Sequence, residues 1–441
     1  MNDNMISDNI GADERGFLTF AGISADRLAA QYGTPLYLID ENRVIERCRE
    51  YLDAFNLNFG QAGGLPCYAC KANCFSGLLK LIDVLGLGID VVSTGEFYTA
   101  MNAGFPVDKI LFHGNAKTDR DLEFALKNGV GRIVVDNSEE LEAISRISRL
   151  IEKKDKTKIL IRVTPGIDPH TYEAVNTGMV DSKFGSAIET GAAFEITEAA
   201  LNTKEVILDG FHCHVGSQVL DEDVHQRAAE VMINFIADVK ERLGFEAKTL
   251  DIGGGIGIRY VESDTHVTIK EAVGKIASVL KKTASERKIK LPFIIMEPGR
   301  SIVADAGMTL YTVSSVKKIP GYRNYVAVDG GMTDNPRYAL YKSKYTCYPA
   351  SDMISDRDME CTVAGCCCES GDIIQTDVPL PSEIRRGDLI AVSCTGAYNY
   401  SMSSNYNRIP RPPVIMIKDE KSRVAVSRES TDDIISHDVI E

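Results

Sequence analysis

Short apolar segments alternate with amphipathic segments between about residues 66 and 299. The apolar segments are rich in β-branched residues and end in a small or polar residue, as buried strands do. Eight predicted strands have this form: residues 66–72, 88–93, 109–114, 132–137, 158–166, 208–216, 249–255 and 293–299. The intervening segments have helical spacing; in 76–86, Leu78, Leu79, Ile82 and Leu85 recur at steps of three and four.

This alternation predicts an α/β fold with a parallel sheet, and eight is the number of strands that closes a (β/α)8 TIM-type barrel. An open, doubly wound sheet remains the alternative. A long insert separates the fifth and sixth strands and contains T-G-M-V-D-S-K-F-G at 177–185. We interpret this segment as a loop over the barrel mouth and not as a ninth strand.

The pattern changes after residue 300, where strand-like runs dominate and Gly-Asp pairs at 371–372 and 387–388 indicate turns. The runs are 325–331, 361–365, 388–393, 414–417 and 423–427. They predict an all-β second domain. We therefore expect an N-terminal segment (1–35), a barrel (36–300) and a β domain that completes the site (301–441). The apolar runs 17–20 and 35–39 are expected to supply an edge strand to the β domain.

Composition narrows the functional class. The net charge of −14 argues against nucleic acid or an anionic membrane as a partner, since both attract positive surfaces. No apolar run approaches the ~20 residues of a membrane-spanning helix, and the N-terminus lacks the basic and apolar regions of a signal peptide. Eleven cysteines, an odd number, fit free thiols in a reducing compartment. We expect a cytoplasmic enzyme.

In a TIM-type barrel the functional residues lie at the carboxyl ends of the strands. Read in order, these ends carry Lys71, Ser93, His113, Asn137, Pro165, His214, Gly253 to Gly255, Glu297 and Arg300. Lys71, in Y-A-C-K-A-N, would be a nucleophile toward an aldehyde if it were desolvated in the barrel mouth. A surface lysine just beyond a strand is the alternative.

Two further strand ends suggest cofactor binding. The glycines of D-I-G-G-G-I-G (251–257) would let backbone N–H groups approach a phosphate, and the loops after strands seven and eight are the usual phosphate site of this fold. The spacing differs from G-x-G-x-x-G, which disfavours NAD. Glu297, in E-P-G-R-S, could keep a pyridine nitrogen protonated. A structural ion pair between Glu297 and Arg300 is the alternative.

F-H-C-H-V-G-S (211–217) places His212 and His214 on one side of a strand. A metal site is the competing interpretation, but no third ligand follows with suitable spacing, and we predict no metal. An aldehyde-binding lysine, a phosphate loop, a stacking histidine and a ring-nitrogen acid together indicate a pyridoxal 5′-phosphate site.

The longer motifs resemble the diaminopimelate decarboxylase family, in the alanine-racemase-like group of fold-type III pyridoxal-phosphate enzymes. The resemblance covers about residues 35–412. The motifs are Y-A-C-K-A-N, H-T-Y-E-A-V-N-T-G (170–178), S-K-F-G (182–185), H-V-G-S-Q, G-G-G-I-G, E-P-G-R-S-I-V-A, V-D-G-G-M-T-D-N, C-C-E-S-G-D (367–372) and G-A-Y-N-Y-S-M-S-S-N-Y-N (396–407).

The resemblance implies roles for individual residues. Lys71 would bind the cofactor covalently, and Cys368 would protonate the carbanion after carbon dioxide leaves. The implied cofactor-binding residues are Lys71, His214, Ser217, Gly254, Gly255, Glu297, Gly299, Arg300 and Tyr398. The implied binding residues for the amino-acid substrate are Arg300, Arg337, Tyr341, Glu369 and Tyr398. Because Cys368 and Glu369 come from the other subunit in this family, a homodimer with shared active sites is implied.

The chain departs from the family pattern at R-Y-A-L-Y, where Tyr338 replaces a proline, and at Cys366 and Cys367, which we interpret as small apolar strand residues. The implied reaction is decarboxylation of meso-2,6-diaminopimelate to L-lysine and CO2, the last step of lysine biosynthesis. A D-ornithine or D-lysine decarboxylase is the nearest rival. An amino-acid racemase would carry arginine at the position of Glu297, and a non-catalytic pyridoxal-phosphate carrier would not need Lys71 with Cys368.

Overall fold

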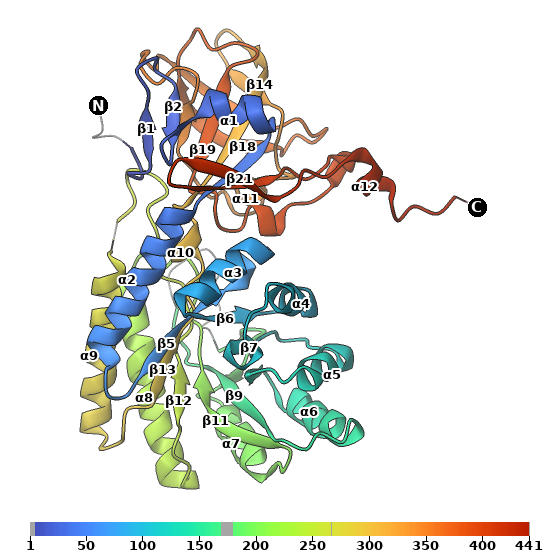
Figure 1. Ribbon diagram of the computed structural model, residues 1–441. Helices are drawn as coiled ribbons and strands as arrows, with labels where there is room; N and C mark the ends of the chain where they lie inside the picture. The colour runs from blue at the N-terminus through green and yellow to red at the C-terminus, as the bar shows by residue number, and fades with distance from the viewer. Residues whose placement is uncertain (1–4, 169–179, 266, 441) are drawn as a thin grey trace. The chain divides into compact units, whose positions relative to one another are not determined.

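The structure is a computed structural model that describes residues 5–168, 180–265 and 267–440. The motif at 170–178 lies outside these residues. The chain forms two compact units (Figure 1). The barrel unit comprises Arg47–Gly257 and His266–Ser301, and the β unit comprises Met1–Glu46, Ile258–Thr265 and Ile302–Glu441.

The barrel unit contains the eight predicted strands. They are β5 (Gly64–Ala69), β6 (Gly88–Val91), β7 (Ile110–Phe112), β8 (Arg132–Val135), β9 (Thr157–Thr164), β11 (Val206–His212), β12 (Thr249–Asp251) and β13 (Phe293–Met296). All neighbouring pairs are parallel, and the pairings of β13 with β5 and β8 with β9 close the circle. This closure confirms the TIM-type barrel and excludes the open sheet.

Helices follow most of the strands and surround the barrel (Figure 1). They are α3 (Ser76–Leu85), α4 (Thr94–Asn102), α5 (Asp119–Lys127), α6 (Ser138–Leu150), α7 (Ala192–Asn202), α8 (Glu222–Leu243) and α9 (Ile269–Glu286). The N-termini of α5 and α9 are capping boxes, in which Thr118 pairs with Asp121 and Thr268 with Glu271. These reciprocal bonds satisfy backbone N–H groups that the first turn of a helix leaves unpaired.

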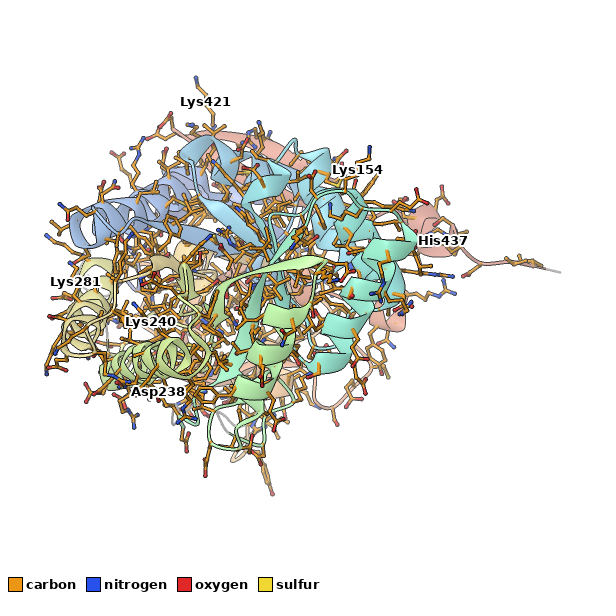
Figure 2. All side chains as sticks on the ribbon, turned by 90° about the horizontal axis from the view of Figure 1, so that it is seen from below. Lys154, Asp238, Lys240, Lys281, Lys421 and His437 are labelled. Atoms are coloured by element: carbon orange, nitrogen blue, oxygen red, sulfur yellow. The ribbon has the colours of Figure 1, made fainter. Side chains whose placement is uncertain are left out.

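The two faces of these helices differ in polarity. Figure 2 shows charged side chains on the outside of the barrel unit, including Asp238 and Lys240 on α8 and Lys281 on α9. The inner faces pack on the strands, and Cys67, Leu111, Val134, Leu160 and Ile295 form one buried cluster inside the barrel. The barrel is therefore a filled core, and its chemistry is confined to the strand ends.

The insert after β9 has little regular structure. Residues 180–185 contain no strand, and the short strand β10 (Ser186–Ala187) pairs with β9 directly after them. The described part of 177–185 thus agrees with our loop interpretation.

The β unit contains a nine-stranded sheet and a small three-stranded sheet. The large sheet consists of β4 (Leu36–Asp40), β14 (Gly307–Lys317), β15 (Tyr325–Val328), β16 (Cys347–Pro349), β17 (Met359–Ala364), β18 (Ile373–Leu380), β19 (Leu389–Ser393), β20 (Val414–Lys418) and β21 (Lys421–Val426). The small sheet consists of β1 (Ile10–Ala12), β2 (Leu18–Phe20) and β3 (Ile23–Ser24). Short helices are α1 (Ala25–Tyr32), α11 (Arg337–Tyr341) and α12 (Thr431–Ile435). The second domain is sheet-rich, as predicted.

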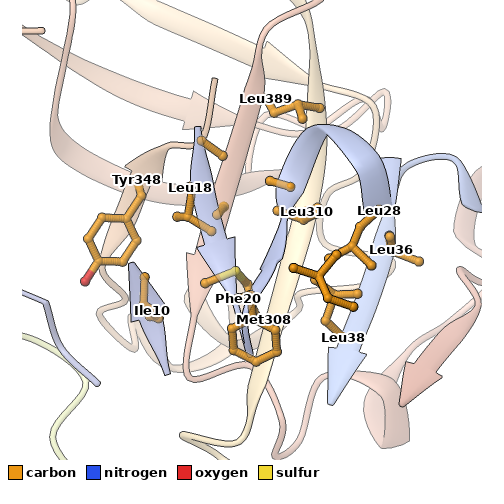
Figure 3. Packing of buried hydrophobic residues seen from close by; sticks show 14 of the residues in the cluster. Ile10, Leu18, Phe20, Leu28, Leu36, Leu38, Met308, Leu310, Tyr348 and Leu389 are labelled. Atoms are coloured by element: carbon orange, nitrogen blue, oxygen red, sulfur yellow. The ribbon is translucent and has the colours of Figure 1, made fainter. Parts of the chain in front are cut away.

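The N-terminal segment differs from our expectation. Strand β4 lies inside the large sheet, between β14 and β20, so the prediction of an edge strand at 35–39 is wrong. All five residues of β4 are buried, which fits a strand covered on both faces. Leu36 and Leu38 pack in one core with Leu18, Phe20 and Leu310 (Figure 3). Residues 36–46 thus belong to the β unit and not to the barrel, which the chain enters along α2 (Glu41–Phe59).

Within the described residues, no helix has both the length and the apolar character needed to cross a membrane.

Candidate active site

The carboxyl ends of the barrel strands bring ionisable side chains together. They are His113 directly after β7, His212 at the end of β11, Asp251 at the end of β12 and Glu297 directly after β13. Each is at most 7% exposed. Asp90 on β6 is also buried, and its pKa responds to the charges of His113 and Glu297. Buried charged groups persist where they are paired, so this cluster is a candidate for function.

Glu297 is the centre of this cluster. Its Oε1 lies 2.6 Å from Nε2 of His113, and its Oε2 lies 3.2 Å from Nε2 of His212. Burial by itself raises the pKa of Glu297. The charges of the two histidines and their contacts with the carboxylate have a larger, opposite effect, and the net pKa is well below its usual range. Glu297 is therefore an ionised carboxylate inside the barrel.

These contacts argue against a metal ion at this place. The candidate ligand atoms of His113, His212, Asp251 and Glu297 lie within 4.8 Å of one another. Two ligands of one tetrahedral zinc ion, at bonds of about 2.0–2.1 Å, are about 3.3 Å apart. The 2.6 Å contact between His113 and Glu297 is shorter than this and fits a direct ion-pair contact, with no metal ion between the two atoms.

The neighbouring carboxyl groups behave differently from Glu297. Burial and the charge of Glu297 raise the pKa of Asp251 well above its usual value. Burial is also the main reason that the pKa of Asp90 rises to about 6. Asp251 accepts the backbone N–H of Gly253 at 2.9 Å and so connects the cluster to the glycine-rich loop. Of these three carboxyl groups, Glu297 has its pKa lowered and the other two have theirs raised.

The glycine-rich loop after β12 lies against His214. The N–H of Gly254 donates to Nδ1 of His214 at 3.3 Å, and His225 on α8 donates to the carbonyl of Gly254 at 3.2 Å. A Cβ on Gly254 would lie 2.0 Å from the carbonyl oxygen of Glu297. Gly255 has a φ of +106°, and its Cβ would lie 2.0 Å from the carbonyl oxygen of Gly216. Only glycine fits these two positions, which leaves the backbone open to a phosphate.

Lys71 lies in a short 3-10 turn, Cys70–Ala72, immediately after β5. Burial raises the pKa of Asp90 and Glu96 and lowers that of His214, and the positive charge of Lys71 makes a smaller, lowering contribution to all three pKa values, which places its ammonium near all three groups. The side chain is exposed in the chain as described. Our expectation of a desolvated lysine is therefore wrong for the single chain without ligand. Lys71 lies in the turn after β5, outside the packed interior of the barrel.

The segment after β13 packs closely against this turn. A Cβ on Gly299 would lie 2.9 Å from the Cβ of Ala72 and 3.0 Å from that of Ala69. Arg300 is buried, and its Nη2 donates to Oγ of Ser217 at 2.9 Å. The alternative interpretation, an ion pair between Glu297 and Arg300, is not among the ion pairs of the described residues, in which Glu297 pairs with the two histidines.

The remaining predicted site residues belong to the β unit. Arg337 begins α11 and is buried, with its guanidinium 5.4 Å from the ring centre of Tyr341 and 5.3 Å from that of Tyr398. One donor, Nη2, reaches Ser343 at 3.3 Å, whereas Nε has no hydrogen-bond partner among the described residues. A buried guanidinium with an unused donor suits a carboxylate ligand.

Cys368 and Glu369 lie in the turn between β17 and β18, and both are exposed. The backbone N–H of Cys368 donates to Asn407 at 2.9 Å, and Glu369 accepts the N–H of Gly371 at 3.1 Å. Asp372 stabilises the turn, because its carboxylate accepts the N–H of Cys367 at 2.7 Å.

Sequence reasoning missed part of the barrel cluster. His113 was recognised as a strand-end residue but received no role, and His212 was considered only with His214 as a metal pair. The signal for Asp90 and Asp251 was available, since an acidic residue within a buried apolar strand requires a partner. Which partner each residue finds depends on barrel closure, which no local pattern shows.

Comparison with known proteins identifies the family. The model of the pyridoxal-binding domain of pyridoxal-dependent decarboxylases matches residues 41–304. A diaminopimelate decarboxylase of Bacillus methanolicus is 45% identical over 417 residues, which cover 95% of each chain. One of Bacillus subtilis (strain 168) is 43% identical and covers 97% of this chain and 96% of its own. The chain belongs to the diaminopimelate decarboxylase family.

A solved structure agrees with this assignment. Diaminopimelate decarboxylase from M. jannaschii, in co-complex with L-lysine, superposes with a TM-score of 0.90 at 30% identity and covers 98% of both chains. The family resemblance and the fold class predicted from sequence are confirmed.

The residues of the barrel unit fit pyridoxal 5′-phosphate, the cofactor of this family. Glycine positions without space for a Cβ provide a phosphate loop, Lys71 provides an amine, and ionised Glu297 provides an acceptor for a protonated ring nitrogen. Next to these groups, His214 offers an imidazole held by Gly254 that can stack on a ring.

Proposed function

We propose that the protein converts meso-2,6-diaminopimelate to L-lysine and CO2 as a pyridoxal-phosphate-dependent carboxy-lyase. When bound, the cofactor supplies an electron sink for the carbanion that remains after CO2 departs. Side chains of this chain would meet the other requirements, as follows.

Within the barrel unit, Lys71 would bind the cofactor covalently, and Gly254, Gly255 and Ser217 would hold its phosphate. Glu297 would hold the ring nitrogen by an ionic hydrogen bond. His214 would support one face of the ring. This division of roles follows the positions of the residues at successive strand ends.

In the β unit, Arg337 would bind the distal carboxylate of the substrate, with Tyr341 and Tyr398 beside it. Arg300 would assist with a second guanidinium, and Glu369 would bind the distal ammonium. Cys368 would deliver a proton to the α-carbon after CO2 leaves. A substrate with a carboxylate and an amine at each end satisfies all of these groups, whereas ornithine or lysine would leave Arg337 buried without an anion.

We further propose that the enzyme is a homodimer whose two active sites are shared, each taking Cys368 and Glu369 from one subunit and Lys71 from the other. The exposure of the turn that carries Cys368 supports this assignment, because a general acid must reach substrate. We also place the protein in the cytoplasm, since its eleven cysteines are all free thiols.

The ionised Glu297 is the main support for the decarboxylase assignment. A carboxylate that keeps the ring nitrogen of the cofactor protonated suits a reaction that forms a carbanion. The test is product identification with meso-diaminopimelate, D-lysine, D-ornithine and L-ornithine supplied separately to the holoenzyme. We expect CO2 and L-lysine from meso-diaminopimelate and little turnover of the other three. Preferential release of a diamine from D-lysine or D-ornithine would select the D-amino-acid rival. Inversion of an amino acid without CO2 release would select the racemase.

A further inference from the structure

His113 and His212 have no role in the proposed function, yet both contact its central acid. They come from different strands, β7 and β11, and each approaches a different oxygen of Glu297. Their rings also contact each other edge to face, with centres 4.8 Å apart. Two histidines and one carboxylate in contact, all three buried, form a specific polar network and not a chance surface contact.

We propose that His113 and His212 are positioning residues that each contact one oxygen of Glu297, His212 by a hydrogen bond and His113 by a close ion-pair contact, and that they keep this carboxylate ionised and the proton of the cofactor's ring on its nitrogen. This inference rests on the proposed function, because it concerns the ring-nitrogen acid of that site.

The physical need for two donors follows from the position of Glu297. Burial favours the neutral carboxylic acid, and the nearby carboxyl groups of Asp90 and Asp251 add to this tendency whenever they ionise. The charges of His113 and His212 and their contacts with the two oxygens act in the opposite direction and lower the pKa of Glu297. A carboxylate that binds protons more weakly than pyridine leaves the shared proton on the ring, whereas a carboxyl group that retains its own proton leaves the ring neutral.

The protonation state of His212 supports this arrangement. Burial lowers the pKa of His212 to about 4, so its imidazole is neutral near pH 7. A neutral imidazole has one N–H, and donation from Nε2 leaves Nδ1 without a proton. Nδ1 of His212 indeed has no hydrogen-bond partner among the described residues. A neutral donor also preserves the negative charge of Glu297 for the ring nitrogen, which a charged imidazolium would cancel.

Other charged groups near Glu297 cannot replace the histidines. Arg162 on β9 is buried and feels the charge of Glu297, but the ion pairs of Glu297 among the described residues are those with His113 and His212. Lys71 and His214 have other roles in the proposed function. The two histidines are thus the side chains in direct contact with the Glu297 carboxylate.

The experiment measures the ring nitrogen itself. Wild type and variants are loaded with pyridoxal phosphate labelled with 15N in the ring, and the 15N NMR shift at neutral pH reports whether this nitrogen is protonated. Glu297→Gln, which removes the charge, provides the reference for an unprotonated ring. His113→Ala, His212→Ala and the double variant remove the donors, whereas His113→Gln and His212→Gln retain an N–H. His437→Gln, in the exposed C-terminal segment, is the control.

We expect a protonated-type shift in wild type and His437→Gln. Each alanine variant should raise the neutral fraction of Glu297 relative to the ionised fraction by about ten- to a hundredfold, because a hydrogen bond to a charged group is lost. The 15N shift should move toward the Glu297→Gln value, most in the double variant, with recovery in the glutamine variants. The turnover number should fall in the same order, with a smaller change in KM.

A wild-type ring shift in alanine variants that still bind the cofactor would overturn the proposal. If an alanine variant does not fold, as judged by circular dichroism, the comparison passes to His113→Asn against His113→Gln, since asparagine is too short to reach Glu297. Equal ring shifts in those two variants would likewise overturn it. If wild type forms lysine but the 15N shift is the same in wild type and in the histidine variants, the inference is rejected and the proposed function stands. The proposed function fails instead if the labelled enzyme responds as expected but releases no lysine from meso-diaminopimelate.

Discussion

Asp372 provides a sharp test of how the turn with the proton donor is held. It is 3% exposed, and its carboxylate accepts backbone N–H groups from Met332 at 2.6 Å and Cys367 at 2.7 Å. Glycines at 331 and 365 leave room for it, since a Cβ at either position would lie within 2.6 Å of a carboxylate oxygen. A buried acid therefore ties the turn that carries Cys368 to the loop after β15.

Asp372→Ala should remove two hydrogen bonds to a charged group, each contributing about 1.5–3 kcal/mol, and should leave both N–H groups buried. The expected loss is about 3–6 kcal/mol, which for a chain of 441 residues corresponds to a fall of roughly 3–6 °C in the midpoint of thermal unfolding. Since the residue adjoining Cys368 would shift, the turnover number should also fall by about 10–100-fold with cofactor binding retained.

Asp358→Ala is the matched control. Asp358 lies in the same unit and also accepts two hydrogen bonds, from the N–H and hydroxyl of Ser382, but it is exposed. Calorimetry and steady-state kinetics on both variants measure the effect of burial at an equal number of hydrogen bonds. If Asp372→Ala melts and turns over like Asp358→Ala, the argument that buried Asp372 positions the turn is refuted.

Three further predictions concern the site. Borohydride treatment of the holoenzyme should fix the cofactor on Lys71, and peptide mapping that locates it on another lysine would contradict the strand-end register. Glu297→Gln and Glu297→Ala should retain cofactor but lose most turnover, because an unprotonated ring is a weaker electron sink; near-normal rates would make Glu297 purely structural. Lys71→Ala and Cys368→Ala should each be nearly inactive, yet mixing them with subunit exchange should restore about a quarter of wild-type activity, since half of the dimers then have one intact site. No recovery despite verified exchange would reject shared sites and leave the decarboxylase assignment intact.

Much of the fold could be predicted because its signals are local. Each barrel strand is a short, mostly apolar run, and the segments between the strands have helical spacing, so all eight strands lie where the pattern indicates. The N-terminal segment was harder, because a run such as P-L-Y-L-I is compatible with an edge or an interior position. Its burial depends on pairing with β14 and β20, which begin only at residues 307 and 414.

For the site, the sequence by itself determined which chemical groups are present and at which strand ends they lie: an amine at Lys71, a carboxylate at Glu297, an imidazole at His214 and glycines at 254 and 255. Strand period and barrel topology suffice for this. Only the tertiary structure decided that His113 and His212 meet Glu297, and that Asp372 holds the turn with Cys368. Such contacts join residues that are distant in the chain, and their strength comes from burial, which exists only after the strands have closed.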